Sequence, residues 1–233
     1  MKKVHSQSAP ETYARQNKER LANEMTDLAT YPAEDKPVSV FMAGSPGAGK
    51  TEASVELLNQ FPDDRVIRID PDAVREKLPG YTGSNAADYQ AAVSIIVSRA
   101  LDKAFKNDQS FLLDGTFAKY DQARKNVERS LRKKRLVQIL YVYQPPEIAW
   151  HFVEQRRAIE GRAVELGVFI DQYFKAREVV QELKKVHGRH VSVHLLIKDI
   201  RGGQRQFKKG VETIDEHVPE RYTRASLRSL LAN

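Results

Sequence analysis

The sequence has no cysteine and contains only one tryptophan and three methionines in 233 residues. The absence of cysteine excludes disulfide bonds, cysteine-ligated zinc and thiol nucleophiles. Long hydrophobic runs are also missing: no uninterrupted apolar stretch approaches the roughly 20 residues that cross a bilayer, and the residues after Met1 are too polar for a signal peptide. We therefore expect a cytoplasmic protein that does not bind membranes.

Acidic residues are too few to balance the basic ones. The chain has 38 Lys and Arg but 31 Asp and Glu, so its formal net charge is +7. A basic protein favours anionic partners such as nucleotides, sugar phosphates or nucleic acids, although charge alone does not choose among them. The length suits one large α/β domain, or a catalytic domain with a small appendage, and either buries a real core.

Short apolar runs alternate with segments of helical periodicity along most of the chain. Five β-rich runs separated by helices are typical of an α/β fold of three layers, with a mainly parallel five-stranded sheet covered on both faces. The expected strands are Val38–Ala43, Arg65–Ile69, Phe111–Leu113, Leu136–Tyr143 and Val191–Ile197. The expected helices are Glu11–Thr30, Lys50–Asn59, Ala86–Phe105, Tyr120–Lys134, Pro146–Glu160 and Asp171–Val186.

The segment GSPGAGKT, which ends at Lys50 and Thr51, follows the first expected strand and matches the pattern G-x-x-x-x-G-K-[ST] at every fixed position. Its glycines let backbone N–H groups wrap around phosphates, and the helix that follows adds a favourable dipole. We expect Lys50 to reach the β- and γ-phosphates and the Thr51 hydroxyl to ligate Mg²⁺. The alternative, a glycine-rich turn without a ligand, is disfavoured by the strand before it and the helix after it. The predicted nucleotide contacts are Gly44, Ser45, Pro46, Gly47, Ala48, Gly49, Lys50, Thr51 and Glu52.

The fold expected from this loop is that of a P-loop NTPase or kinase, and it divides the chain into three parts. Residues 1–36 form an N-terminal helical segment, and residues 37–200 form the P-loop kinase domain. Residues 201–233 form a C-terminal extension that packs on or trails the kinase domain and ends in a short helix.

Acidic residues follow two of the expected strands. Asp70 and Asp72 stand at the end of the second strand, on the edge where ligands of open α/β sheets bind, so one can orient an acceptor or metal while the other acts as base. The alternative is that Asp72 caps a helix that starts near Ala73 and Asp70 solvates the strand end. Asp114 follows the third strand and has the form of an Mg²⁺-holding acid, although an aspartate before Gly115 also suits an ordinary turn.

Arginines cluster around the end of the helix Pro146–Glu160. Arg156 and Arg157 lie near its end, and Arg162 follows across Gly161, as in the lids of many phosphate-loop kinases. Planar guanidinium groups suit the charge that develops on a transferred phosphate, and we expect at least one of these arginines to be an ordinary surface residue. A second basic run, residues 129–135, is interpreted as the solvated end of a helix rather than a nucleic-acid patch, because no aromatic residue is interleaved with it.

With these residues in place, the chain resembles the zeta toxin family, phosphate-loop kinases of bacterial toxin–antitoxin systems. The resemblance runs from about Val38 to Ile197 and rests on GSPGAGKTE, RIDPDAVREKLPGY, FLLDGT and VEQRRAIEGR. The first element is common to many kinases, whereas the order and spacing of all four are more specific. The resemblance implies a kinase that uses ATP or GTP to phosphorylate the 3′-hydroxyl of UDP-N-acetylglucosamine. Its dead-end product poisons cell-wall synthesis, and an antitoxin is the implied protein partner.

The resemblance also implies roles for single residues. Lys50 would be the phosphate ligand and Thr51 the Mg²⁺ ligand, and Asp72 would be the base. Arg156 and Arg162 look like the arginines that contact the transferred phosphate. The implied catalytic residues are therefore Lys50, Asp72, Arg156 and Arg162, the implied substrate contacts are Asp70, Asp72, Asp114 and Thr116, and the implied metal ligands are Thr51 and Asp114.

The sequence departs from the family pattern at one place. Family members carry a glutamate that holds the acceptor sugar on the helix before the third strand, and this chain has Ser94 or a nearby residue there, with no acid until Asp102. The departure concerns the acceptor more than the reaction. An antibiotic, another metabolite or a polynucleotide end stay open as acceptors, as does an NTP-binding regulatory module without transfer, against which the two acids Asp70 and Asp72 argue. The N-terminal helix is expected to serve as packing, as an antitoxin contact or as an inhibitory segment.

Overall fold

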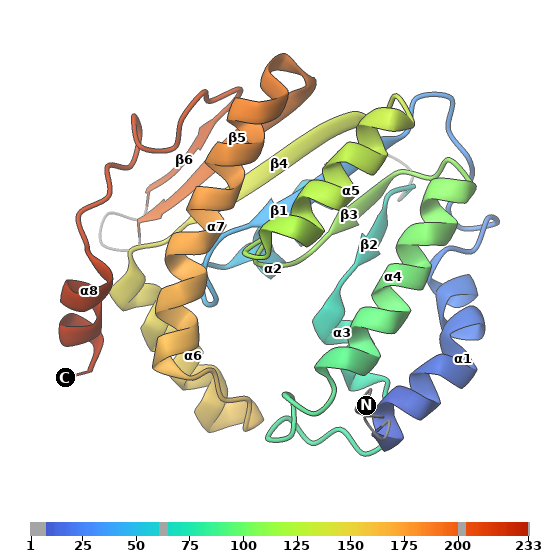
Figure 1. The fold of residues 1–233 in the computed structure, drawn as a ribbon, viewed down its shortest axis with the longest axis horizontal. Coiled ribbons are helices and arrows are strands. Elements are labelled where there is room, and N and C mark those ends of the chain that lie inside the picture. Colours follow the sequence, from blue (N-terminus) through green and yellow to red (C-terminus); the bar gives the residue numbers. More distant parts are fainter. Residues whose placement is uncertain (1–7, 61–64, 200–203, 233) are drawn as a thin grey trace, which may run out of the picture.

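The computed structural model describes residues 8–60, 65–199 and 204–232 (Figure 1). Its sheet has six strands in the order β2-β3-β1-β4-β5-β6, of which the first five are parallel and β6 is antiparallel to β5. The strands are β1 (Val38–Ala43), β2 (Ile67–Ile69), β3 (Phe111–Leu113), β4 (Leu136–Tyr143), β5 (Val191–Asp199) and β6 (Gln204–Lys208).

The expected α/β sandwich with a mainly parallel sheet is confirmed, but the predicted number of five strands is one too low. The sixth strand, β6, has the sequence QRQFK and lies at the edge of the sheet, where it pairs only with β5. A charged edge strand carries no apolar alternation that would reveal it in the sequence. The sheet therefore extends into the region that the sequence assigns to the C-terminal extension.

Helices cover both faces of the sheet (Figure 1). In that view α4, α5 and α7 lie in front of the strands and α2 lies behind them. A large apolar cluster packs the strands against α4, α5 and α7 through residues such as Ile96, Val127 and Leu183. A smaller cluster around Met42 packs the other face of the sheet against α2. The helices are α1 (Ala9–Met25), α2 (Lys50–Leu58), α3 (Pro71–Glu76), α4 (Gln90–Lys106), α5 (Tyr120–Arg132), α6 (Pro146–Glu160), α7 (Leu166–His187) and α8 (Arg224–Leu231), with a 3-10 turn, η2 (Gly188–His190), before β5.

The N-terminal helix α1 packs along α4 on the outside of the sandwich (Figure 1). Ala14 and Ala22 are fully buried at this contact. Beyond α1 the chain is fixed by the buried Gln109, whose amide nitrogen donates to the carbonyl oxygens of Thr26 at 3.1 Å and Tyr31 at 2.6 Å. Packing is thus one role of this helix.

Two local predictions are corrected by the structure. The helix after β2 begins at Pro71 rather than near Ala73. In the basic run 129–135, residues 132–134 are exposed, but Arg135 is only 4% exposed and its Nε donates to the Ser39 hydroxyl at 2.8 Å. Arg135 is therefore a buried anchor of β4, because a guanidinium can stack on Phe105 and Phe111 while its N–H groups find oxygen acceptors. Within the described residues, none of the helices has the length and apolar character needed to span a membrane.

Candidate active site

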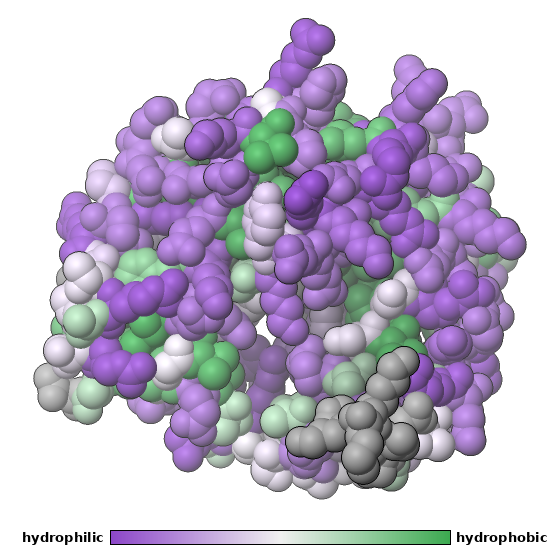
Figure 2. All heavy atoms as spheres, in the orientation of Figure 1, coloured by the Kyte–Doolittle hydropathy of each residue, from purple (hydrophilic) through white to green (hydrophobic). Residues whose placement is uncertain are grey.

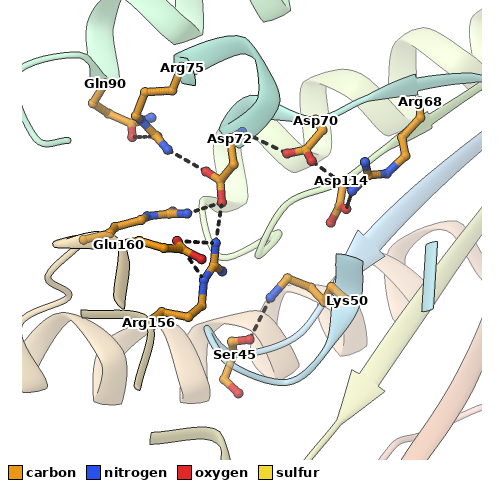
Figure 3. A network of polar contacts seen from close by, with 11 residues as sticks. Ser45, Lys50, Arg68, Asp70, Asp72, Arg75, Gln90, Asp114, Arg156 and Glu160 are labelled. Carbon is orange, nitrogen blue, oxygen red and sulfur yellow. Dashed lines mark hydrogen bonds and ion pairs between the residues drawn. The ribbon is translucent and has the colours of Figure 1, made fainter. Parts of the chain in front are cut away.

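The predicted site residues come from five segments that meet at the carboxyl ends of β1, β2 and β3, the edge at which ligands of open α/β sheets bind. Figure 2 shows that the molecule is hollowed between the part that contains α6 and the part that contains α3 and α4. Figure 3 shows Lys50 on one side of this space and the carboxylates of Asp70, Asp72 and Asp114 on the other.

The phosphate loop connects β1 to α2 and is held by close backbone packing. Gly47 has φ +72°, and an added Cβ would lie 2.0 Å from the carbonyl oxygen of Ala149 in α6, so no larger residue fits without moving that helix. Gly49, with φ +78°, is the N-cap of α2, and its carbonyl oxygen accepts a hydrogen bond from Lys198 of β5 at 2.9 Å. Ala48 is buried, whereas Thr51 and Glu52 are exposed in the first turn of α2.

Lys50 lies along the loop that it ends. Its ammonium donates to the carbonyl oxygens of Ser45 at 2.7 Å and Gly44 at 3.1 Å. Burial lowers the pKa of Lys50 from 10.5 to about 8, although the nearby carboxylates of Asp114 and Asp72 favour the charged form. The group is therefore mostly protonated near neutral pH and can act as a cation toward phosphate.

Asp72 is the centre of a cluster of three arginines from three different segments, here called the Asp72 cluster. Arg75, one turn further along α3, donates to Oδ1 at 2.5 Å. Arg162 donates to Oδ2, and Arg156 of α6 lies 3.9 Å from the same oxygen and 3.3 Å from Glu160. Burial alone would raise the pKa of Asp72, but the charges and hydrogen bonds of Arg162 and Arg75 outweigh it and lower the pKa below 3.8.

The predicted alternative for the acids after β2, in which Asp72 caps the helix, is wrong. Asp70 is the N-cap of α3, and its Oδ1 accepts from the backbone N–H of Asp72 at 2.8 Å. Pro71 then occupies the first helical position, where a missing N–H leaves nothing unsatisfied. Asp72 therefore does not cap the helix, and its side chain points toward the arginines (Figure 3).

A second cluster, here called the Asp114 cluster, lies deeper at the same edge (Figure 3). Oδ2 of Asp114 accepts from Arg68 at 2.7 Å and from the Ser54 hydroxyl at 3.0 Å. Arg68 also forms an ion pair with Asp70 at 2.9 Å. Burial raises the pKa of Asp70, while its hydrogen bond from the Asp72 N–H and the charge of Arg68 act in the opposite direction.

The loop after β3 is tied to the phosphate loop. The carbonyl oxygen of Thr116 accepts from the N–H of Gly44 at 3.3 Å, and the Thr116 side chain is half-buried. This bond keeps Asp114 and Thr116 beside the phosphate loop. The role of Thr116 as a substrate contact stays a prediction.

Of the predicted lid arginines, the structure brings Arg156 and Arg162 to Asp72 but not Arg157. Arg157 is exposed on α6, and among the described residues it forms no ion pair. The end of α6 approaches the loop before α4: Gly83 has φ +82°, and a Cβ there would lie 2.1 Å from the carbonyl oxygen of Glu160. The turn at Gly161, also at positive φ, then directs Arg162 back toward Asp72.

Four polar partners in these clusters have no role in the sequence analysis, although Arg68 and Arg75 lie within RIDPDAVREKLPGY. They are Ser54, Arg68, Arg75 and Gln90. Gln90, the first residue of α4, accepts from Arg75 at 3.2 Å and so connects α4 to the Asp72 cluster. Arg68 has a sequence signal, since it lies between Ile67 and Ile69 in a strand that is otherwise apolar, where an unpaired charge would be expensive. The other three carry no comparable signal.

A hollow of about 780 Å³ lies between the first turn of α1 and the start of α4, here called the α1–α4 hollow. Ser94, which takes the place of the family's glutamate in our prediction, lines this hollow, but its hydroxyl donates to the Gln90 carbonyl oxygen at 2.8 Å within its own helix. Gln90 lines the same hollow. The other residues around it include Ser8, Glu11, Asn85, Asp88 and Lys119.

The residues present fit Mg²⁺ held jointly with phosphates rather than by the protein alone. No group of three acidic or histidine side chains that could hold a metal occurs in the described ranges 8–60, 65–199 and 204–232. Mg²⁺ keeps several waters and takes one or two protein ligands plus substrate phosphates in kinase sites. The exposed Thr51 hydroxyl and the Asp114 carboxylate are the two donors that suit this arrangement.

Comparison with known proteins agrees with this architecture. A parallel sheet in this order with a phosphate loop after β1 defines a P-loop kinase fold. A family model described as Zeta toxin matches residues 22–212. The chain therefore belongs to the zeta toxin family, and it is a nucleotide-binding phosphotransferase.

Solved structures resemble the fold at low sequence identity. The PezAT toxin–antitoxin system of Streptococcus pneumoniae matches at TM-score 0.66 and 14% identity, over 98% of this chain and 91% of that one. The AvrRxo1-ORF1:-ORF2 complex with ATP matches at TM-score 0.62 and 14% identity, over 91% and 71%. The Pnkp1/Rnl/Hen1 RNA repair complex matches at TM-score 0.51 and 13% identity, over 65% and 47%. No curated protein sequence matches the chain.

Proposed function

We propose that this kinase transfers the γ-phosphate of ATP or GTP to a hydroxyl of a nucleotide sugar, the 3′-hydroxyl of UDP-N-acetylglucosamine, and that it acts as a bacterial toxin. The observation that carries the proposal is the position of Asp72. This carboxylate lies across the hollowed edge from Lys50 and in contact with arginines of the α6 region. A carboxylate in the acceptor position also argues against a regulatory NTP-binding module, because phosphate sensing alone requires no base there.

Each charged group has a role in the transfer that follows from its surroundings. Lys50 and the backbone N–H groups of the phosphate loop bind the β- and γ-phosphates, with the dipole of α2 in support. Asp72 accepts the proton of the acceptor hydroxyl as that oxygen attacks phosphorus. Arg156 and Arg162 contact the transferred phosphate and stabilise the charge that develops on it. Thr51 and Asp114 would hold Mg²⁺ together with the nucleotide, and the ion would supply positive charge beside the phosphates.

The contacts of Asp72 imply that substrates compete for its partners. Arg162 and Arg75 lower the pKa of the Asp72 carboxylate, and these contacts weaken it as a base. A γ-phosphate draws Arg156 and Arg162 toward itself, because two or three phosphate charges attract a guanidinium more strongly than one carboxylate does. Nucleotide binding thus frees Asp72 and raises its basicity when the acceptor is present.

The acceptor lies on the α4 side of Asp72 in this proposal. The α1–α4 hollow has a size suited to a metabolite. Gln90, which lines it, accepts a hydrogen bond from Arg75, and Arg75 also donates to Asp72. Asp70, Asp114 and Thr116 approach the same edge from the ends of β2 and β3. The similar PezAT structure is a toxin–antitoxin system, and the similar AvrRxo1-ORF1:-ORF2 structure is a complex of two proteins, which supports an antitoxin as the protein partner.

The direct test is incubation of the purified protein with Mg²⁺, ATP and UDP-N-acetylglucosamine, followed by mass spectrometry for an added phosphate. An Asp72→Asn variant serves as the control for catalysis. A phosphorylated sugar nucleotide formed by the unmodified protein alone is the expected result. If ATP binds but no acceptor is phosphorylated, the nucleotide-sugar proposal is wrong. An RNA oligonucleotide with a 5′-hydroxyl belongs in the same assay, since an RNA repair complex shares the fold.

Toxicity has a separate test in bacteria. Expression of the unmodified chain is expected to arrest growth, and Lys50→Ala is expected to remove both the arrest and the transfer reaction, because a phosphate ligand used in the transition state is lost. Arrest that persists in Lys50→Ala would show that toxicity does not arise from phosphoryl transfer.

A further inference from the structure

Arg68 is a half-buried cation, and although it opens the segment RIDPDAVREKLPGY, the sequence analysis assigns it no role. It is the central residue of β2, between Ile67 and Ile69, which are both buried on one face of the sheet. Because side chains alternate along a strand, Arg68 points to the opposite face, toward α2. There its Nε donates to the Ser54 hydroxyl at 2.9 Å. β2 and β3 pair in register at Arg68 and Leu112, so Asp114, two residues further along, lies within reach of the same guanidinium.

The charge balance at this edge depends on Arg68. The side chains of Asp70 and Asp114 are only 13% and 5% exposed, and two carboxylates so poorly solvated need a cation beside them. Within residues 8–60, 65–199 and 204–232, no other basic side chain forms an ion pair with either of them. The Arg68 guanidinium lies 2.9 Å from Asp70 and 2.7 Å from Asp114, so it serves both.

The contacts are also selective for one oxygen of Asp114. Oδ2 accepts both the Arg68 and the Ser54 hydrogen bonds, and within the described ranges Oδ1 accepts none. The carboxylate is therefore fixed in rotation by two donors on one side. Within these ranges, Oδ1 is the oxygen left for a ligand.

We propose that Arg68 is a positioning residue that occupies one oxygen of Asp114 and thereby limits this acid to a single-oxygen contact with Mg²⁺, direct or through water. A bidentate contact would require Oδ2 to release Arg68 or Ser54, because these two donors occupy both of its lone pairs. The Arg68 charge also weakens the attraction of Asp114 for a divalent cation, so that Mg²⁺ is held firmly only when phosphates supply the remaining ligands. The inference rests on the proposed function only for nucleotide and Mg²⁺ binding, and not for the acceptor.

The test compares ATP affinity with and without the metal. A fluorescent ATP analogue is titrated into the unmodified protein and into Arg68→Met, once with Mg²⁺ and once with EDTA. The Kd in EDTA divided by the Kd in Mg²⁺ measures the coupling between metal and nucleotide. Loss of the competing cation is expected to increase this ratio about tenfold. If Arg68 only holds the sheet edge together, both Kd values change by the same factor and the ratio stays constant, which would overturn the proposal.

Matched variants separate charge from packing. Arg68→Lys keeps the cation and is expected to leave the ratio within about twofold of the unmodified protein. In an Asp114→Asn background, Arg68→Met is expected to lose most of its effect on the ratio, because the carboxylate that it screens is gone. An undiminished effect in that background would show that Arg68 acts elsewhere.

A milder variant keeps the proposal testable if Arg68→Met does not fold. Ser54→Ala removes the second donor to Oδ2 of Asp114 with the loss of a single oxygen atom. It is expected to raise the ratio about two- to threefold, since a neutral hydrogen bond restrains the carboxylate less than an ion pair does. An unchanged ratio in Ser54→Ala, with Arg68→Met unfolded, would contradict the proposal. None of these measurements uses an acceptor, so they are unaffected if UDP-N-acetylglucosamine is not a substrate.

Discussion

The Asp72 cluster and the Asp114 cluster lie at the same edge of the sheet, but they are built in different ways. Asp114 is 5% exposed, and its partners Arg68 and Ser54 come from β2 and α2, which belong to the rigid core of the sandwich. Asp72 is 32% exposed, and two of its partners, Arg156 and Arg162, come from the far side of the hollowed edge, around the end of α6. One cluster is packed within the sandwich, whereas the other connects two parts of the molecule across the hollowed edge.

This difference separates two tasks of a kinase. A frame that holds metal and nucleotide works best when it is preorganised, so its charges are paired within the core. A base and the arginines that contact phosphate must change partners during the reaction, so their charges are paired across a space that a substrate can enter. The comparison predicts that substitutions in the Asp72 cluster reduce the rate of transfer, while those in the Asp114 cluster change nucleotide and metal affinity.

The largest effect is expected for Asp72→Asn. The amide cannot accept the hydroxyl proton, so kcat is expected to fall on the order of 10²- to 10⁴-fold. Because Arg156 and Arg162 lose a competitor, the Kd for ATP is expected to stay constant or decrease. Steady-state kinetics and ATP titration measure the two quantities. Asp171→Asn, which removes an exposed ion-pair partner on α7, is the control and should change neither. Retained transfer in Asp72→Asn would refute its assignment as the base.

Arg162→Ala is expected to have the next largest effect. Arg162 is half-buried and bonded to Asp72, and removal of one group that stabilises developing phosphate charge lowers kcat by about 10²-fold. Arg157→Ala, from the exposed side of α6, is the matched control and should stay within about twofold of the unmodified enzyme. Equal losses in the two variants would show that the lid acts through its total positive charge and not through the geometry of the Asp72 cluster.

The sequence predicts the parts of this edge that depend on local pattern. The phosphate loop, the strand ends before Asp70 and Asp114, and the helix that carries Arg156 all lie where the sequence places them, because periodicity and glycine spacing are local properties. The ion pairs cannot be read in that way. Whether Arg156 or Arg157 turns toward Asp72 depends on the rotation of α6 in the assembled fold, and Gln90 reaches Arg75 only because α3 and α4 pack together.

The fold shows the same division between local and tertiary information. β4 and α6 have the predicted bounds, since an apolar run and a proline-started helix are clear signals. The sixth strand, β6, is missed because its pairing with β5 stabilises a sequence without β-strand pattern. Arg135 belongs to a charged run and is nevertheless buried, because the rings of Phe105 and Phe111 accommodate its guanidinium. In each case a tertiary partner overrides local preference.

The protonation of Lys50 predicts how ATP binding depends on pH. Burial lowers the pKa of Lys50 to about 8, so the ammonium loses its proton as the pH rises through 8. Phosphates favour the charged form, so above this pH ATP binding must take up a proton, and the Kd is expected to increase by up to about tenfold per pH unit. Lys50→Arg stays charged, and its Kd should show no such bend. A bend that persists in Lys50→Arg would assign the titration to another group.

The smallest effect is expected for Gly83→Ala, which disturbs the connection across the hollow without changing any charge. At φ +82° the residue is strained by a side chain, and its Cβ would lie 2.1 Å from the Glu160 carbonyl oxygen, so the loop and the end of α6 must separate. Because Arg162 follows Glu160 by two residues, its contact with Asp72 is loosened and kcat is expected to fall by about threefold to tenfold.

In Gly83→Ala, the ratio of ATP affinities with Mg²⁺ and with EDTA should stay constant, since the Asp114 cluster does not touch this loop. Gly167→Ala in α7 is the control for adding a methyl group, because a Cβ there would meet the flexible end of the Arg228 side chain at 3.3 Å. A change in the affinity ratio of Gly83→Ala would show that the two clusters are coupled.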